Sequence, residues 1–270
     1  MRTSSGNPVA RLAARVGRGT ARSLDDLGFG GSLLAESVYW IFLGRRRKQP
    51  VRVPATFAQM MEIGIRALPI VSVLAAAVGI MLAMQGIHTL RTFGAESQVV
   101  IGIGLSVTRE FAPLITGILV AGRSGSALAA RLASMTLSQE IDALRVIGIA
   151  PVRYLIAPAL VAMLVMLPLL TFWTDVVALL AAGLWVSAEL GTPLLVYADR
   201  LLDVIGTEDL LHGLSKSGVF AVLITVVGAV NGASVSGGAE GLGRMTTRAV
   251  VQAISAIVIA DMTYVFLTTR

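Results

Sequence analysis

Three ionisable residues, Arg109, Glu110 and Asp261, lie within stretches of the chain that are otherwise apolar. A charged side chain near the middle of a bilayer costs about 2.5–3.5 kcal/mol on insertion scales, so each should face a partner, water or a polar ligand. One interpretation is a cluster that contacts a lipid headgroup or gates a cavity. The other is an internal ion pair in which Glu110 or Asp261 neutralises Arg109. Neighbouring residues on a helix point about 100° apart, so Arg109 and Glu110 should not pair with each other.

A second group of residues could support nucleophilic chemistry. Residues 122–125 (GRSG) have the form of the nucleophile loop of intramembrane serine proteases, and His212 is a possible base. A Ser–His hydrogen bond needs about 3 Å, whereas the predicted topology places Ser124 and His212 at opposite ends of their spans. The sequence has no cysteine, only two histidines and no GxxxxGK[ST] motif. We therefore expect no enzyme activity, no metal site and no ATP site on this chain.

A charged stretch, residues 134–151, separates two apolar runs and has the pattern of a short amphipathic helix. Thr136 and Gln139 fit a capping box, and Gly148 followed by Pro151 supplies a stop, so the predicted helix covers about residues 136–147. Its apolar face consists of Leu137, Ile141, Leu144 and Ile147, and the charged residues of the stretch are Glu140, Asp142 and Arg145. Either the protein's own helices or a groove on a cytoplasmic partner could cover the apolar face.

The composition is that of an integral membrane protein, since 55% of the 270 residues are hydrophobic and 14% are charged. Soluble domains carry about 25% charged residues. Five stretches are long enough to cross the roughly 30 Å core of a bilayer as helices. They cover about residues 67–87, 99–121, 155–186, 211–231 and 248–268. We interpret the third, which contains Pro168 and Asp175, as one long, tilted and kinked helix. Gly228 and Gly232 have the GxxxG spacing of closely packed helices.

Basic residues predict the orientation of these spans. With the N-terminus in the cytoplasm, residues 1–66, 122–153 and 232–248 are cytoplasmic and contain 17 of the 22 Lys and Arg residues. This distribution follows the positive-inside rule and places the C-terminus outside, so the basic charge indicates topology rather than nucleic-acid binding. Residues 33–44, beside the basic cluster at 45–48, predict a helix in the headgroup plane. The alternative is a disordered basic tail with a short soluble helix.

Three long segments of the sequence resemble the MlaE/YrbE family, the permease subunits of ABC-type lipid transporters that work with MCE-domain proteins. They are residues 109–158 (REFAPLITGILVAGRSGSALAARLASMTLSQEIDALRVIGIAPVRYLIAP), 236–251 (SGGAEGLGRMTTRAVV) and 82–97 (LAMQGIHTLRTFGAES). The resemblance covers about residues 60–268. It implies an all-α membrane domain over 61–270, with five spans, after an arm and an interfacial helix in residues 1–60.

The same resemblance implies partners and a role. The chain would form a homodimer, or pair with a paralogue, in the bacterial inner membrane and move phospholipid or another hydrophobic lipid to or from an MCE-domain protein. Residues 136–147 would be the coupling helix that docks on a separate ATPase subunit, which binds the ATP and Mg²⁺. Two positions depart from the family pattern: Arg131 stands where an acidic residue is usual, and Ala159 follows Pro158 where an arginine is usual. These departures leave the polarity of the ATPase contact open.

Two further hypotheses concern the route of the substrate. The first predicted span offers Leu74, Val78, Met81 and Leu82 as the lining of an apolar cavity, although residues of these types at helical spacing also suit plain core packing. The rival function is an ion- or proton-coupled secondary transporter that uses Glu110 or Asp261 as its carrier. Many such folds contain inverted repeats, and the sequence shows none.

Overall fold

Five helical segments of the chain are long and apolar enough to cross a membrane, namely Val53–Arg91, Glu96–Leu137, Val152–Leu190, Thr207–Ala233 and Gly238–Thr268. This computed structural model describes residues 8–44 and 51–268, and within those ranges it contains helices and no strand. Each predicted span falls inside one of the five segments. The all-α fold class is therefore confirmed, and the five predicted spans coincide with five helical segments that are long and apolar enough to cross a membrane.

Several spans are divided into shorter elements. The first contains α2 (Val53–Ile63), η1 (Ile65–Ala67) and α3 (Leu68–Arg91). The second contains η2 (Glu96–Gln98), α4 (Val99–Ser106), η3 (Val107–Phe111), α5 (Ala112–Val120), η4 (Ala121–Gly125) and α6 (Ser126–Leu137). The third contains η5 (Val152–Ile156) and α8 (Ala157–Leu190), and the last two are α10 (Thr207–Ala233) and α11 (Gly238–Thr268). Outside the spans lie α1 (Pro8–Leu43), α7 (Glu140–Val146) and α9 (Leu194–Val204).

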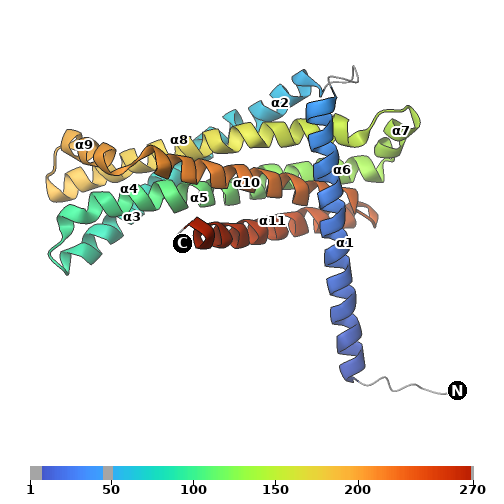
Figure 1. The fold of residues 1–270 in the computed structure, drawn as a ribbon, viewed down its shortest axis with the longest axis horizontal. Helices are drawn as coiled ribbons and strands as arrows, with labels where there is room; N and C mark the ends of the chain where they lie inside the picture. The colour runs from blue at the N-terminus through green and yellow to red at the C-terminus, as the bar shows by residue number, and fades with distance from the viewer. Residues whose placement is uncertain (1–7, 45–50, 269–270) are drawn as a thin grey trace.

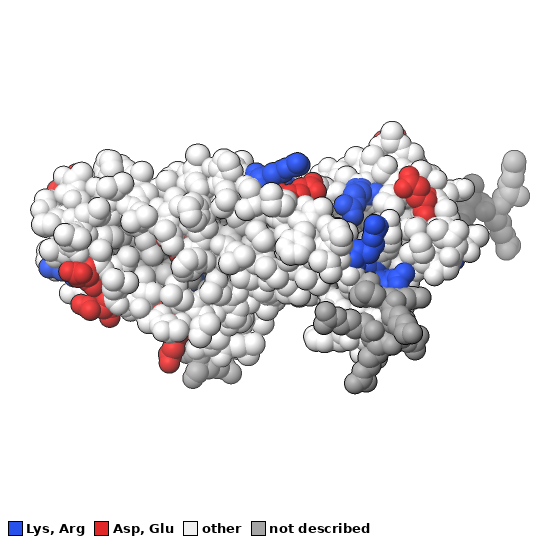
Figure 2. Space-filling model, turned by 90° about the horizontal axis from the view of Figure 1, so that it is seen from above, with Lys and Arg blue, Asp and Glu red and all other residues white. Residues whose placement is uncertain are grey.

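The spans run roughly parallel to one another, and α1 crosses them steeply near α6 and α7, whereas α9 lies at the opposite end (Figure 1). We call these the α7 end and the α9 end of the bundle. The face in Figure 2 is largely uncharged between its ends, and most of its basic residues gather toward the α7 end. A broad uncharged belt with charged ends is the surface expected of a protein that crosses a bilayer.

Small residues allow the helices to approach closely. A Cβ at Gly232 would lie 2.6 Å from the Cβ of Leu132, and a Cβ at Gly228 would lie 3.1 Å from the carbonyl oxygen of Gly125. The GxxxG pair on α10 therefore packs against η4 and α6, as its spacing predicts. On the other side of the bundle, Gly79 of α3 leaves no room for a Cβ against the Ala178 carbonyl of α8.

The third span is one continuous helix, as predicted, and Pro168 lies within α8. Thr174 of this helix exchanges a 2.8 Å hydrogen bond with Thr116 of α5, and both hydroxyls are buried. The Asp175 side chain beside it is also buried, and its Oδ1 atom has no hydrogen-bond partner among the described residues.

The N-terminal region is more helical than its sequence suggested, because residues 33–43 of the predicted segment 33–44 belong to a helix that begins at Pro8. On one side of α1, Leu33 is buried against apolar residues of α6, α8 and α10. On the other, Leu27 and Phe42 are exposed. This division suits a helix that lies along a membrane surface, which stays a prediction. The predicted basic cluster at residues 45–48 lies outside the described residues.

The boundaries predicted for the charged helix are wrong. Thr136 and Leu137 end α6, and α7 begins only at Glu140, because Gln139 adopts a left-handed φ of 61° that interrupts the helix. The Thr136 hydroxyl donates to the Leu132 carbonyl at 2.8 Å, so the predicted capping box does not form. The predicted stop is confirmed, since Gly148 has a φ of 78° and lies two residues beyond the last residue of α7.

Candidate functional site

Charged residues from three spans meet where η3 packs against α10 and α11. The Arg109 guanidinium contacts the Asp209 carboxylate at 2.5 Å. The Lys216 ammonium lies 2.6 Å from the Glu110 carboxylate and 3.0 Å from the carboxylate of Asp261. We call these five residues the intramembrane charge cluster.

Burial divides the cluster into an inner and an outer part. The Lys216 side chain is fully buried, whereas those of Arg109 and Glu110 are 47% and 38% exposed. A buried ammonium requires close counter-charges, which two carboxylates supply here. Two cations and three carboxylates leave one formal negative charge on the cluster. The half-exposed side chains of Arg109 and Glu110 are the groups that a polar ligand could reach.

Polar and aromatic side chains of α10 and α11 surround Lys216. The Tyr264 hydroxyl lies 2.5 Å from the Ser215 hydroxyl, and the imidazole of His212 packs edge-on against the Tyr264 ring at 4.9 Å. Lys216 Nζ lies 5.7 Å from the centre of the same ring. A further hydrogen bond fixes the outer part of the cluster, since the Gly206 N–H donates to Asp209 Oδ2 at 2.8 Å. Asp209 therefore connects the cluster to the start of α10, and Tyr264 connects it to α11.

Local backbone structure explains how Arg109 and Glu110 reach two different partners. They lie in η3, a turn of π-helix inside the second span. Pro113 follows shortly, and a proline has no N–H to donate and collides with the preceding turn of a regular helix. A wider π-turn relieves that conflict and changes the direction of the side chains around it. Gly213 then lets α10 approach η3, because a Cβ there would overlap the Thr108 carbonyl oxygen.

The sequence identified three of the five cluster residues and misassigned one pair. Arg109 is neutralised by Asp209, so the prediction that Glu110 or Asp261 would neutralise it is wrong. The prediction that Arg109 and Glu110 do not pair with each other is confirmed. Lys216 was missed, although a lysine five residues inside the predicted span 211–231 is itself a signal of an internal partner.

No metal site accompanies these carboxylates in the ranges 8–44 and 51–268, where no three His, Asp or Glu side chains are placed to hold an ion. Glu110 and Asp261 are both engaged by Lys216. The chemistry that the cluster offers is therefore electrostatic: it can hold a polar group or a counter-charge within the membrane.

The four residues predicted to line a cavity lie on α3, away from the elements that form the charge cluster. Leu74 and Met81 are exposed, Val78 is half-buried, and Leu82 packs against a core that includes Ala83, Val99 and Ala182. α3 packs mainly along α8. One copy of the chain therefore does not bring these residues to the cluster, and a cavity lined by them between two copies stays a prediction.

The apolar face of α7 is shared between two environments. Ile141 and Leu144 pack against the buried core of α6, η5 and α10, which includes Leu132 and Val152. Val146 and Ile147 remain 87% and 68% exposed. Leu137 is exposed as well, but it belongs to the end of α6.

The charged residues of α7 face away from the core. Asp142 and Arg145 form an exposed ion pair at 3.0 Å, and Glu140 accepts a hydrogen bond from the Ser138 hydroxyl at 2.8 Å. The helix is therefore held by its own bundle and still presents an apolar and charged edge to a partner.

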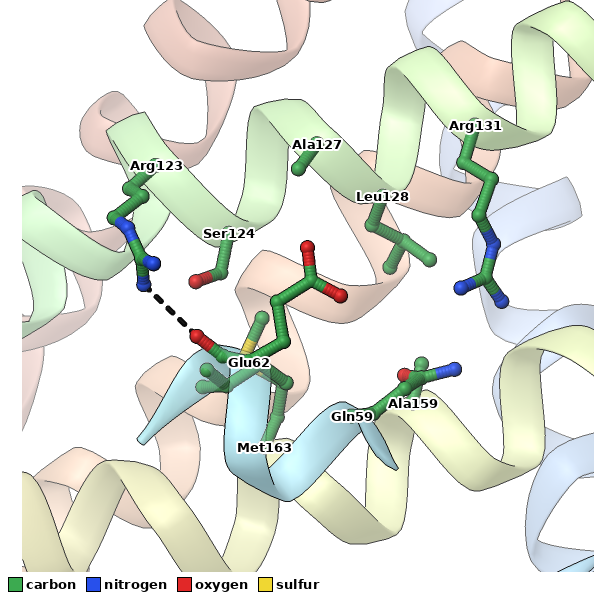
Figure 3. Close-up of a pocket in the computed structure, with 10 residues that line it drawn as sticks. Gln59, Glu62, Arg123, Ser124, Ala127, Leu128, Arg131, Ala159 and Met163 are labelled. Carbon is green, nitrogen blue, oxygen red and sulfur yellow. Dashed lines mark hydrogen bonds between the residues drawn. The ribbon is translucent and has the colours of Figure 1, made fainter. Parts of the chain in front are cut away.

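The two departures from the family pattern meet at one cavity. Arg131 of α6 and Ala159 of α8 both line a cavity of about 270 Å³ between α2, η4, α6 and α8, at the α7 end (Figure 3). An arginine at position 159 would extend into this space. The departures therefore alter a cavity beside α2, and neither residue belongs to α7.

Ser124 and His212 lie too far apart to form a catalytic pair. Ser124 lines the same cavity, and its neighbour Gly125 packs against Ile224 of α10. Ile224 lies twelve residues beyond His212, which is about 18 Å along a helix. His212 contacts Tyr264 instead.

The fold and the charge cluster define a class: a multi-pass membrane protein of helices, with paired charges held inside the spans. Comparison with known proteins then gives the family. Residues 56–267 match the family model described as Permease MlaE, and the chain belongs to that family.

Similar proteins carry consistent names. A probable ABC transporter permease protein of Rickettsia felis is 31% identical over 214 residues, which cover 79% of this chain and 83% of that protein. The chloroplastic protein TRIGALACTOSYLDIACYLGLYCEROL 1 of Arabidopsis thaliana is 34% identical over 76% of this chain and 59% of its own length. The intermembrane phospholipid transport system permease protein MlaE of Haemophilus influenzae is 30% identical over 74% of this chain and 77% of that protein. The chain is thus a membrane permease of the ABC-transporter type.

Proposed function

We propose that this chain is the membrane-spanning subunit of an ABC transporter that moves phospholipid, or another hydrophobic lipid, between an inner membrane and an MCE-domain partner. The observation that carries the proposal is the family match over residues 56–267, which includes every residue of the charge cluster. The similar protein of Haemophilus influenzae is named for intermembrane phospholipid transport. ATP and Mg²⁺ would be bound by a separate ATPase subunit.

The charge cluster supports a role in handling the polar part of the lipid. A phospholipid that leaves a bilayer must keep its headgroup solvated or paired while its chains stay in apolar surroundings. Arg109 and Glu110 are half-exposed and each has a fixed counter-charge. They could exchange those partners for the phosphate or amine of a headgroup. Because the pairs join three spans, such an exchange would also loosen the packing of α10 and α11 on η3.

The exposed edge of α7 is the proposed contact with the ATPase. Val146 and Ile147 supply an apolar patch, and Glu140, Asp142 and Arg145 supply charges around it. Ile141 and Leu144 transmit movement of α7 to the core of α6 and η5, since they pack against it. The α7 end would then be cytoplasmic, in agreement with the excess of basic residues predicted there.

The ATPase contact is tested by co-purification. Val146→Asp with Ile147→Asp should abolish association with the ATPase and its stimulation. The matched control is Leu195→Asp with Leu202→Asp, which changes two equally exposed apolar residues of α9 at the other end of the bundle. Association that survives the α7 double change would remove α7 from the interface.

The function as a whole is tested by transport in vesicles. The permease is reconstituted with its ATPase and MCE-domain protein, and transfer of a fluorescent phospholipid is measured with ATP and with a non-hydrolysable analogue. Phospholipid transfer should require ATP hydrolysis, and the rate of transfer should fall in the variants Arg109→Ala and Asp261→Asn. Transfer driven by an ion or proton gradient without ATP would support the rival secondary transporter. The pairing of both Glu110 and Asp261 with Lys216 argues against that rival, which needs a carboxylate free to take up an ion.

A further inference from the structure

A polar cavity at the α7 end lies well apart from the charge cluster. It lies between α2, η4, α6 and α8, opens to the surface and has a volume of about 270 Å³. Arg123 and Arg109 lie on the same span, fourteen residues apart, which corresponds to about 21 Å along a helix. Since a bilayer core is about 30 Å thick, the cavity and the cluster belong to different depths of the membrane.

Two buried polar side chains line this cavity without a partner. Gln59 and Ser124 are each only 8% exposed, and neither side chain makes a hydrogen bond with another described residue. Both line the cavity, so a ligand there can pair with their polar atoms. The Ser124 hydroxyl and the Gln59 amide lie on either side of the Glu62 side chain in Figure 3. Their placement indicates that a polar ligand completes the site.

The charges of the cavity favour an anion that also carries hydrogen-bond donors. Arg123 is held in place, because its Nη1 donates to the Glu62 main-chain oxygen at 3.0 Å. Arg131 makes no hydrogen bond or ion pair with any residue in the described ranges, and its guanidinium reaches toward the cavity from α6 (Figure 3). The Glu62 carboxylate also has no ion-pair partner there. The Arg131 guanidinium suits a phosphate, and the Glu62 carboxylate, which lies between the two arginines, suits hydroxyl or amine donors attached to that phosphate.

Part of the cavity wall is apolar. Ile63 of α2, Leu128 of α6 and Met163 of α8 line it beside the polar side chains. A free anion gains nothing from apolar contacts, whereas the glycerol and first acyl carbons of a lipid are stabilised by them. A volume of about 270 Å³ suits a headgroup better than a whole lipid, because pockets for complete small molecules run from about 300 to 1,000 Å³.

We propose that this cavity binds the headgroup of a phospholipid from the leaflet at the α7 end. Arg131 and Gln59 hold the phosphate on one side of Glu62, and Glu62 and Ser124 bond the hydroxyl or amine groups beyond it. The glycerol backbone and the first acyl carbons contact Ile63, Leu128 and Met163. Basic pockets between membrane helices bind anionic headgroups by the same chemistry. The site is independent of the transport function proposed above, since it needs only a chain embedded in a bilayer.

The test is native mass spectrometry of the full chain in detergent, titrated with phosphatidylglycerol, which has headgroup hydroxyls, or with phosphatidylcholine, which has none. Wild type should bind one phosphatidylglycerol tightly and phosphatidylcholine at least about tenfold more weakly. Arg131→Ala should weaken phosphatidylglycerol binding by about tenfold or more, and Arg131→Lys by less, because lysine cannot make the bidentate contact. Ala159→Arg should abolish binding by filling the cavity.

The matched control is Arg244→Ala, which removes an exposed arginine of α11 at the same end of the bundle and should leave binding unchanged. Thermal unfolding of each variant shows whether it is folded. If Ala159→Arg does not fold, the binding measured for Arg131→Ala tests the proposal by itself.

Equal binding by Arg131→Ala and Arg244→Ala would overturn the proposal. So would equal binding of the two lipids. Displacement of phosphatidylglycerol by millimolar inorganic phosphate would assign the site to a free anion and overturn the lipid assignment. Loss of ATPase association in Arg131→Ala with unchanged lipid binding would assign the residue to a protein interface.

Discussion

At the scale of single residues, Lys216 is a buried cation that holds two spans against its own helix through ion pairs. Its ammonium is fully buried and serves two carboxylates from different spans. Removing one partner of a buried ion pair costs about 3–5 kcal/mol, because the remaining charge is left uncompensated. Lys216→Met should therefore lower the thermal unfolding midpoint in detergent strongly and reduce lipid transfer.

A neutral triple variant separates the structural from the functional role of this cluster. In Lys216→Met with Glu110→Gln and Asp261→Asn no unpaired charge remains, so stability should largely return. If the cluster handles a headgroup, lipid transfer should remain low in the triple variant. Recovery of both stability and transfer would show that the three charges serve only the fold.

Tyr197 offers a residue-scale prediction outside the spans. It belongs to α9 and is buried against α8, its hydroxyl donates to the Leu179 carbonyl at 3.1 Å, and burial raises the pKa of Tyr197 to about 12. The folded-state pKa lies above the value of about 10 for an unfolded tyrosine. This side chain therefore contributes stability that is complete below pH 10 and is lost as the pH rises toward 12. Absorbance titration of tyrosinate should lose its highest-pH step in Tyr197→Phe, and a step near pH 10 that disappears instead would contradict the assignment.

At the scale of the elements, the contact between α10 and η3 positions the charge cluster. Gly213 faces the Thr108 carbonyl with no room for a Cβ, whereas nothing lies within 4 Å of a Cβ at Gly218 on the same helix. Gly213→Ala should cost about 1–3 kcal/mol by overpacking and should separate Lys216 from Glu110. Gly218→Ala should be neutral or stabilising by up to about 1 kcal/mol, because alanine favours helix. Thermal unfolding of both variants measures this, and equal effects would contradict the close approach.

The sequence predicts elements well where a single physical pattern controls them. Apolar length alone predicted all five spans, and small-residue spacing predicted a close helix contact at Gly228 and Gly232, without naming the partner helix. The start of α7 could not be predicted in this way, because the Thr136 hydroxyl could bond forward as a cap or back to Leu132, and tertiary packing selected the second.

The ion-pair partners within the charge cluster could not be predicted from the sequence either. Arg109, Glu110 and Asp261 were visible as charges in apolar runs. Their partners depend on the π-turn before Pro113 and on the approach of α10, which no local pattern in the sequence encodes. Asp209 lies two residues outside the predicted fourth span, so the sequence pattern did not identify it as a residue within the membrane.

At the scale of the whole molecule, the two ends of the bundle carry different polar elements. The α7 end has the headgroup cavity, α1 and the exposed edge of α7, and the α9 end has an amphipathic helix with exposed leucines. The charge cluster lies between η3 and the first half of α10, toward the α9 end. The apolar face of α11 is mostly uncovered in one copy of the chain, so lipid or a second copy must cover it.

The orientation of these ends in the membrane is testable without altering any native thiol, because the chain has no cysteine. Ile147→Cys on the segment after α7 and Leu195→Cys on α9 each introduce one exposed thiol at one end. A membrane-impermeant maleimide should label Leu195→Cys in intact spheroplasts and Ile147→Cys only in inverted vesicles, because the positive-inside rule places the α7 end in the cytoplasm. The reverse pattern would place α7 outside. It would also exclude α7 as the contact with a cytoplasmic ATPase, since a subunit that hydrolyses ATP must reach its coupling helix from the side where ATP is found.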